Sequence, residues 1–167
     1  MTTNENEQTG PGRGPGPKIL TDGDLSALLG DHFFGALAAN KRSGHPHLST
    51  VVYRWDPAER IVRVSSTADR LKVRQLRNDP RAALYVSSPD HMAYVVAEGT
   101  AEIAETTVPG DAVGQELLSL IVPEITDPAE REGFLKAQVE DHRVVIRLRV
   151  ERLYGMALDL PKEVQDA

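Results

Sequence analysis

Apolar residues recur at every second position over much of the chain, which is the period of a β-strand with one buried face. The clearest example is residues 143–155, RVVIRLRVERLYG, where Ile146, Leu148 and Val150 share one face and charged residues occupy the other. Five further apolar, β-rich runs are found at 32–40, 46–55, 60–66, 81–88 and 92–103. Because tight turns join most of them, the pattern predicts an antiparallel meander of about six strands that closes into a barrel.

Helical spacing occurs in fewer places, mostly outside the run of strands. Thr21 and Asp24 form a capping pattern for a short helix that ends at Gly30. Residues 110–140 carry helical spacing on both sides of Pro123, and a basic helix lies between two strands near residue 70. A doubly wound sheet would need a helix between nearly every pair of strands. The expected fold class is therefore mainly β with flanking helices.

Composition sets the expected domain limits and excludes several chemistries. Residues 1–17 contain no aliphatic side chain after Met1, which predicts a disordered tail before a folded domain at 18–160 and a short tail at 161–167. The chain has no cysteine, which excludes disulfides, thiolate metal sites and thiol nucleophiles. No apolar run approaches the roughly 20 residues of a membrane span, and no signal-peptide pattern is present. A cytoplasmic protein without a membrane partner is expected.

The stretch 69–81, DRLKVRQLRNDPR, concentrates five basic side chains in a chain whose net charge is −6. Ser66, with an aspartate three residues later, predicts an N-cap for a helix through this stretch, and Pro80 predicts its end near Asn78. A solvated helix face, a nucleic-acid patch or a pocket for a smaller anion would each account for the charge. The acidic balance of the chain argues against broad binding of polyanions.

The basic side chains of this helix separate into two sets. Arg70, Arg74 and Arg77 fall on one stripe at about 100° per residue, and such a stripe is most simply a solvated face. Lys72 lies away from the stripe and flanks the buried side, where a lysine is rarely placed without an anionic partner.

The strand that ends in VSS runs directly into the start of this helix, where free backbone N–H groups and the helix dipole favour an anion. We expect the hydroxyls of Ser65, Ser66 and Thr67 to converge there on a phosphate, together with Arg70 and Lys72. Simple capping of the helix is the alternative interpretation for the serines.

One face of the 46–55 strand is polar at one end and apolar at the other, passing through His47, Ser49, Val51, Tyr53 and Trp55. A face of this kind suits a flat, amphipathic ring system. The H-x-H pair at 45–47 could be half of a metal site, but no third ligand lies nearby in the sequence, so no metal is expected. No arrangement for nucleophilic or paired-carboxylate catalysis stands out. No catalytic side chain is therefore assigned, and a cofactor is expected to carry any reaction.

Four segments carry a resemblance to a known family: LAANKRSGHPHLSTVVYRWD, IVRVSSTADRLKVRQLRNDPRAAL, YVVAEGTAEI and VVIRLRVERLYGM. Together they resemble the pyridoxamine-phosphate-oxidase-like split β-barrel superfamily, and specifically its branch of coenzyme F420-dependent flavin/deazaflavin oxidoreductases. The similarity spans about residues 20–158. Its most specific part is the strand that leads into the Ser-Ser pair and the basic helix.

The resemblance implies a homodimer of six-stranded antiparallel split β-barrels, with one cofactor in each of two clefts at the subunit interface. It implies hydride transfer between reduced F420 and a small organic acceptor. It assigns the cofactor phosphate to Lys72, Arg70, Ser65 and Ser66, the deazaflavin ring to His47, Ser49, Thr50 and Val51, and closure of the pocket to Met92, Ala93 and Tyr94. Gln75 stands where asparagine is common in the branch, and Met92 where a tryptophan occurs.

Two alternatives keep the same fold: an FMN-binding oxidoreductase, and a non-catalytic cofactor-binding protein. FMN and F420 both carry a ribityl phosphate, so Lys72 and Arg70 do not distinguish them. A nucleic-acid partner is not expected, because the arginine stripe lacks the interleaved aromatic residues on which bases stack.

Overall fold

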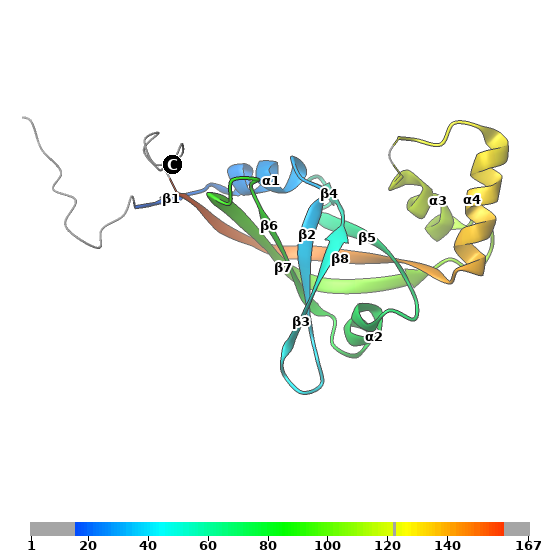
Figure 1. Ribbon diagram of the computed structural model, residues 1–167, viewed down its shortest axis with the longest axis horizontal. Coiled ribbons are helices and arrows are strands. Elements are labelled where there is room, and N and C mark those ends of the chain that lie inside the picture. Colours follow the sequence, from blue (N-terminus) through cyan, green and yellow to red (C-terminus); the bar gives the residue numbers. More distant parts are fainter. Residues whose placement is uncertain (1–15, 122, 159–167) are drawn as a thin grey trace, which may run out of the picture.

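The structure is a computed structural model that describes residues 16–121 and 123–158. Its strands form one antiparallel sheet in the order β3-β2-β6-β7-β8-β5-β4, with β1 paired to β8 (Figure 1). The strands are β1 (Pro17–Ile19), β2 (Phe34–Asn40), β3 (Pro46–Val52), β4 (Arg54–Asp56), β5 (Ile61–Thr67), β6 (Arg81–Ser87), β7 (Ala93–Glu105) and β8 (Arg143–Leu158). The helices are α1 (Asp22–Gly30), α2 (Leu71–Asn78), α3 (Ala112–Ser119) and α4 (Pro128–Glu140).

The sheet curls into a split barrel, which confirms the expected fold class. β3 and β5 are not hydrogen-bonded neighbours, yet they contact each other across the gap between the two sides of the sheet. The six long strands match the six predicted runs, and β1 is a three-residue addition. The predicted 46–55 strand breaks at Tyr53 into β3 and β4.

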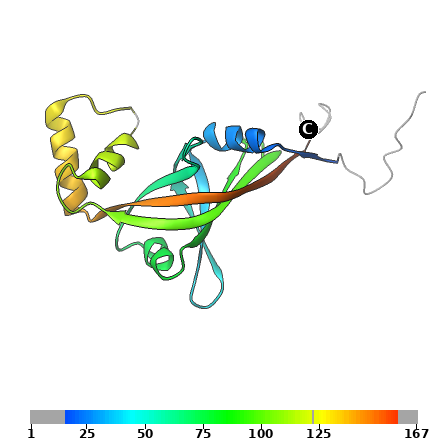
Figure 2. The same cartoon turned by 180° about the vertical axis from the view of Figure 1, so that it is seen from behind.

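The two longest strands, β7 and β8, run side by side through the whole molecule, with the α3–α4 pair at one end and β1 at the other (Figure 2). Their register shifts by one residue between Glu98 and Gly99, which leaves Glu151 of β8 without a residue opposite it on β7. Only glycine fits at position 99, since a Cβ there would lie 1.8 Å from the carbonyl oxygen of Arg149.

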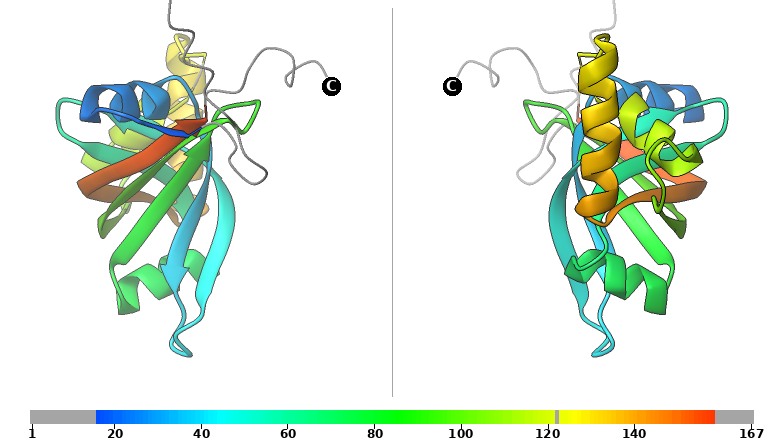
Figure 3. Two further views of the ribbon diagram at one scale, coloured as in Figure 1. Left: turned by 90° about the vertical axis from the view of Figure 1, so that its left-hand side faces the viewer. Right: turned by 90° about the vertical axis from the view of Figure 1, so that its right-hand side faces the viewer.

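The core lies inside the curled sheet, between α1 on one side and α2 on the other (Figure 3). Leu29 of α1 and Val73 and Leu76 of α2 are buried in it. Tyr53 donates its hydroxyl to the carbonyl oxygen of Leu29 at 2.7 Å, and burial raises the pKa of this phenol. The alternation predicted for the last strand is confirmed as far as Val150, since the even-numbered residues are buried.

The helix boundaries agree with the predictions at α1 and differ at α2. Thr21 and Asp24 form the expected reciprocal capping box of α1. The expected N-cap at Ser66 is wrong, because β5 continues to Thr67 and α2 begins at Leu71 without a side-chain cap.

The tails fall mostly outside the description. Of the expected tail at 1–17, residues 1–15 lie outside the described ranges, and Pro17 already belongs to β1. The tail at 161–167 also lies outside them. None of the helices in the described ranges is long and apolar enough to cross a membrane.

Candidate cofactor site

The first element of the candidate site is the pair of cations at the start of α2. Arg70 is exposed and Lys72 is half-buried, and neither forms an ion pair with any residue in the described ranges. Burial lowers the pKa of Lys72, and the nearby charge of Arg70 lowers it further. On the same segment, a hydrogen bond from the hydroxyl of Thr67 at 2.5 Å lowers the pKa of Asp69, and the charge of Arg70 lowers it further. This pair of cations is electrostatically suited to an anion.

The two serines at the end of β5 point to opposite faces of the sheet, as successive strand residues must. Ser66 faces the core and is 7% exposed. Ser65 faces outward and accepts a hydrogen bond from Nη2 of Arg143 at 2.5 Å. The strand therefore separates the two hydroxyls that the sequence analysis grouped around one phosphate.

Arg143 is a residue that the sequence analysis missed. It opens β8, directly opposite Thr67 in the β5–β8 ladder. Its Nε is buried and has no hydrogen-bond partner among the described residues. No local pattern reveals this pairing, because it joins residues 78 positions apart.

The inward face of β3 carries two of the predicted ring-binding residues with unsatisfied polar atoms. Nδ1 of His47 and Oγ of Ser49 are buried without a hydrogen-bond partner among the described residues. Oε1 of Gln75 in α2 is in the same state. Val51 follows on this face and is buried in the core. Buried polar atoms are nearly always hydrogen-bonded in folded proteins. These orphaned atoms therefore fit a site that is completed by a polar ligand.

The remaining predicted residues lie on or near the outer face of the sheet. Thr50 points away from the core and lines a hollow of about 480 Å³, together with Tyr85 of β6 and His91 of the β6–β7 turn. Tyr94 stacks on Tyr85 with ring centroids 5.6 Å apart. The structure thus places Thr50 and Tyr94 on the opposite side of the sheet from His47 and Ser49.

Backbone and side-chain hydrogen bonds of the β6–β7 turn hold the other two predicted residues beside Tyr94. The amide of Ala93 donates to Oγ of Ser88 at 2.9 Å, and the carbonyl of Met92 accepts from the amide of Leu158 at 2.7 Å. Met92 and Ala93 are therefore positioned by both β6 and β8.

Large apolar side chains are exposed around this outer hollow. Phe34 of β2 is 56% exposed, and Leu48 and Val52 of β3 and Tyr85 of β6 are exposed to similar extents. Strand pairing aligns them on one face, since Phe34 lies opposite Val52 and Ala36 lies opposite both Thr50 and Tyr85. An apolar sheet face of this kind is typical of a protein interface.

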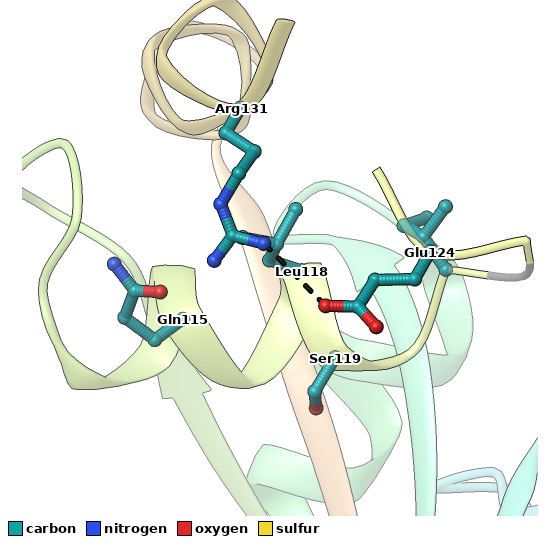
Figure 4. Close-up of a pocket in the computed structure, with 6 residues that line it drawn as sticks. Gln115, Leu118, Ser119, Glu124 and Arg131 are labelled. Atoms are coloured by element: carbon teal, nitrogen blue, oxygen red, sulfur yellow. Dashed lines mark ion pairs between the residues drawn. The ribbon is translucent and has the colours of Figure 1, made fainter. Parts of the chain in front are cut away.

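A separate hollow of about 530 Å³ lies between α3 and α4 (Figure 4). Arg131 of α4 reaches across it, 3.6 Å from a carboxylate oxygen of Glu124, and donates to the carbonyl of Ile125 at 3.1 Å. Its charge is therefore satisfied within the chain. None of the predicted site residues lines this hollow.

The curled antiparallel sheet defines a split-barrel protein, and the cation pair at the start of α2 and the orphaned polar atoms on the inner face of the sheet make up a candidate cofactor site. A family model for pyridoxamine 5'-phosphate oxidase matches residues 21–157. The chain belongs to this family, which confirms the resemblance drawn from the sequence.

Several solved structures share this fold. A conserved hypothetical protein from Mycobacterium tuberculosis is 22% identical, covers 84% of this chain and 86% of its own, and has a TM-score of 0.65. A protein described as an F420 reductase is 25% identical over 77% of this chain and 94% of its own, with a TM-score of 0.55. An FAD-binding protein from Mesorhizobium loti is 18% identical over 86% and 99%, with a TM-score of 0.58. At the level of the family, the chain is a flavin-type oxidoreductase or a flavin-binding protein.

Proposed function

We propose that the protein is an F420-dependent oxidoreductase that transfers a hydride between reduced F420 and a small organic acceptor. The observation that carries this proposal is the half-buried Lys72 beside Arg70, with no carboxylate paired to either in the described ranges. A phosphate bound there would relieve the repulsion between the two cations and accept charge-assisted hydrogen bonds from both.

The inner face of β3 would hold the flat ring of the cofactor. His47 and Ser49 would each gain a hydrogen-bond partner for an atom that is otherwise orphaned. The bound deazaflavin supplies the hydride. The chain's own residues anchor the phosphate, orient the ring and exclude water, which are the contributions that a transfer at close range requires.

The proposal includes a homodimer formed through the apolar outer face of β2, β3 and β6. Packing two such faces together would bury Phe34, Leu48, Val52 and Tyr85. It would also cover the outer hollow that Thr50 lines. In this arrangement Thr50, Tyr94 and the β6–β7 turn would face a site shared between subunits, in keeping with the expected interface clefts.

Among phosphate-bearing redox cofactors, F420 is favoured by the match to the F420 reductase, which is the most identical of the structures compared above. FMN remains the second candidate, since the FAD-binding relative shares the fold. A third possibility, a cofactor-binding protein without turnover, shares the same anchoring residues.

Equilibrium titrations of the purified protein with F420 and, separately, with FMN test the cofactor. We expect saturable F420 binding that is tighter than FMN binding. Tight FMN binding without measurable F420 binding would overturn the choice of cofactor. Oxidation of reduced F420 in the presence of a panel of unsaturated or nitroaromatic acceptors, followed by absorbance, then separates an enzyme from a carrier.

A further inference from the structure

A basic hollow of about 540 Å³ lies between α2 and the turn that joins β2 to β3. Three cationic residues line it: Lys41 and Arg42 from the turn, and Arg74 from α2. The rest of the lining is Asn40, Leu71, Gln75 and Asn78, so no carboxylate contributes to it.

No ion pair holds the charges of this hollow within the described part of the chain. None of Lys41, Arg42 and Arg74 forms an ion pair there. The carboxylate of Asp79, which follows the helix, already pairs with Arg81 at 2.7 Å and accepts a hydrogen bond from the side-chain amide of Asn40 at 3.0 Å. The charge of Arg74 helps to lower the pKa of Asp69, but no carboxylate lines the hollow itself. Three cations that line one hollow repel one another, and a bound anion relieves this repulsion.

A buried polar atom at the same place provides a second, independent sign of a ligand. Gln75 lines the hollow, is only 9% exposed, and carries an Oε1 without a hydrogen-bond partner among the described residues. This oxygen can only accept, so it fits a hydroxyl or N–H group on the ligand. The hollow therefore offers guanidinium and ammonium donors to an oxyanion and one acceptor to a neighbouring donor.

This hollow cannot share one anion with Lys72. Lys72 and Arg74 are two positions apart on α2, which turns their side chains about 160° away from each other. Lys72 is not among the residues that line the hollow. Two separate negative groups are needed to satisfy both.

We propose that this hollow is a second oxyanion site, which takes a carboxylate-rich small molecule bearing a hydroxyl or N–H donor. The inference stands apart from the proposed function, because it does not depend on which cofactor Lys72 holds. It also revises the interpretation of Arg74 as part of a merely solvated stripe. The oxyanion can belong to a free organic acid or to a distant part of the molecule whose phosphate lies at Lys72.

Calorimetric titration with citrate, a hydroxylated tricarboxylate, at constant ionic strength tests the site. We expect Arg74→Gln to weaken citrate binding about tenfold or more, the loss of one charge-assisted hydrogen bond. Gln75→Met should also weaken it, and both losses should persist in a Lys72→Gln background, which removes any citrate bound at the Arg70–Lys72 pair. The matched control is Arg77→Gln, which removes one positive charge from the same helix, where Arg77 is paired with Glu105 at 3.3 Å. Matching thermal melts show that the variants are folded.

Three results would overturn the second site: no citrate binding at millimolar concentrations, the same affinity in Arg74→Gln as in the wild type, or equal losses in the Arg74 and Arg77 variants. The source of the oxyanion follows from repeating the citrate titration with saturating F420 or FMN. Unchanged citrate affinity assigns the hollow to a separate acid, and competition assigns it to a part of the cofactor. Because Arg74→Gln should leave phosphate binding at Lys72 intact, failure here is distinguishable from failure of the proposed cofactor.

Discussion

Replacing Phe34 with alanine tests whether the outer face of the sheet forms the subunit interface. A phenylalanine has roughly 150–250 Å² to bury, and Phe34 leaves 56% of its surface exposed in the isolated chain. About 100 Å² per subunit is therefore available for burial, worth about 2.5 kcal/mol at about 25 cal/mol per Å².

A two-fold symmetric dimer buries Phe34 of both subunits, and alanine retains part of the contact area. We therefore expect Phe34→Ala to weaken the dimer by about 3–4 kcal/mol, which raises its dissociation constant about 10²- to 10³-fold. Sedimentation velocity over a concentration series measures this constant directly. Cofactor titration of the same samples shows whether binding is lost as the dimer dissociates.

The control is Val108→Ala, since Val108 is 61% exposed but lies in the loop after β7, away from this face. Its dissociation constant should equal that of the wild type. A wild-type protein that stays monomeric at high micromolar concentration would refute the interface, and so would a dimer that Phe34→Ala leaves unchanged.

Three further predictions concern single side chains. Lys72→Ala should weaken cofactor binding by about 1.5–3 kcal/mol. It should not lower the free energy of unfolding, because burial lowers the pKa of this lysine. Arg77→Ala should change neither the cofactor affinity nor the free energy of unfolding, and equal binding losses in the two variants would contradict the assignment. Glu116→Gln should cost about 2–3 kcal/mol in urea unfolding, since Glu116 accepts hydrogen bonds from Arg63 and Arg147 at 2.8 and 3.0 Å; a change below about 0.5 kcal/mol, within the range of ordinary surface substitutions, would argue against it. Burial raises the pKa of Asp111, but hydrogen bonds from Thr107, Gly114 and neighbouring groups outweigh this and lower it from 3.8 to about 2. Its stabilisation is therefore complete above pH 4 and is lost as the pH falls toward 2, so Asp111→Ala should cost about 1–2 kcal/mol at pH 7 and nothing below pH 2.

The strands and α1 could be predicted because their signals are local. Alternation fixed the buried face of β3, including Ser49 and Val51, and the reciprocal contacts of Thr21 and Asp24 mark a helix start within four residues. The start of α2 could not be predicted, because a Ser-x-x-Asp pattern reads the same at the end of a strand as at a helix cap.

The rest of the candidate site depends on contacts between distant parts of the chain. The position of Arg143 beside Ser65 follows from the β5–β8 register, and that of Arg74 beside the β2–β3 turn follows from the docking of α2. Neither register nor docking has a signature in the immediate sequence. The separation of Thr50 from Ser49 was visible in the strand period, but the family resemblance grouped them, since it carries no information about faces.

The unpaired Glu151 determines which residues at the end of β8 lie on the outer face of the sheet. Before it, even-numbered residues of β8 point into the core, and after it Leu153 packs against the core while Tyr154 and Met156 share the face of Val96 and Tyr94. With this residue deleted, the pairs Gly99–Val150 and Glu98–Arg152 would become consecutive, and Leu153, Tyr154 and Met156 would keep their present faces. A regular strand that kept all of its residues would instead set Glu151 opposite Glu98, which would turn Tyr154 and Met156 inward and Leu153 outward. The bulge is therefore what places this aromatic ring and this thioether on the outer surface, and a homologue that is one residue shorter at this point would present the same surface from an unbroken ladder.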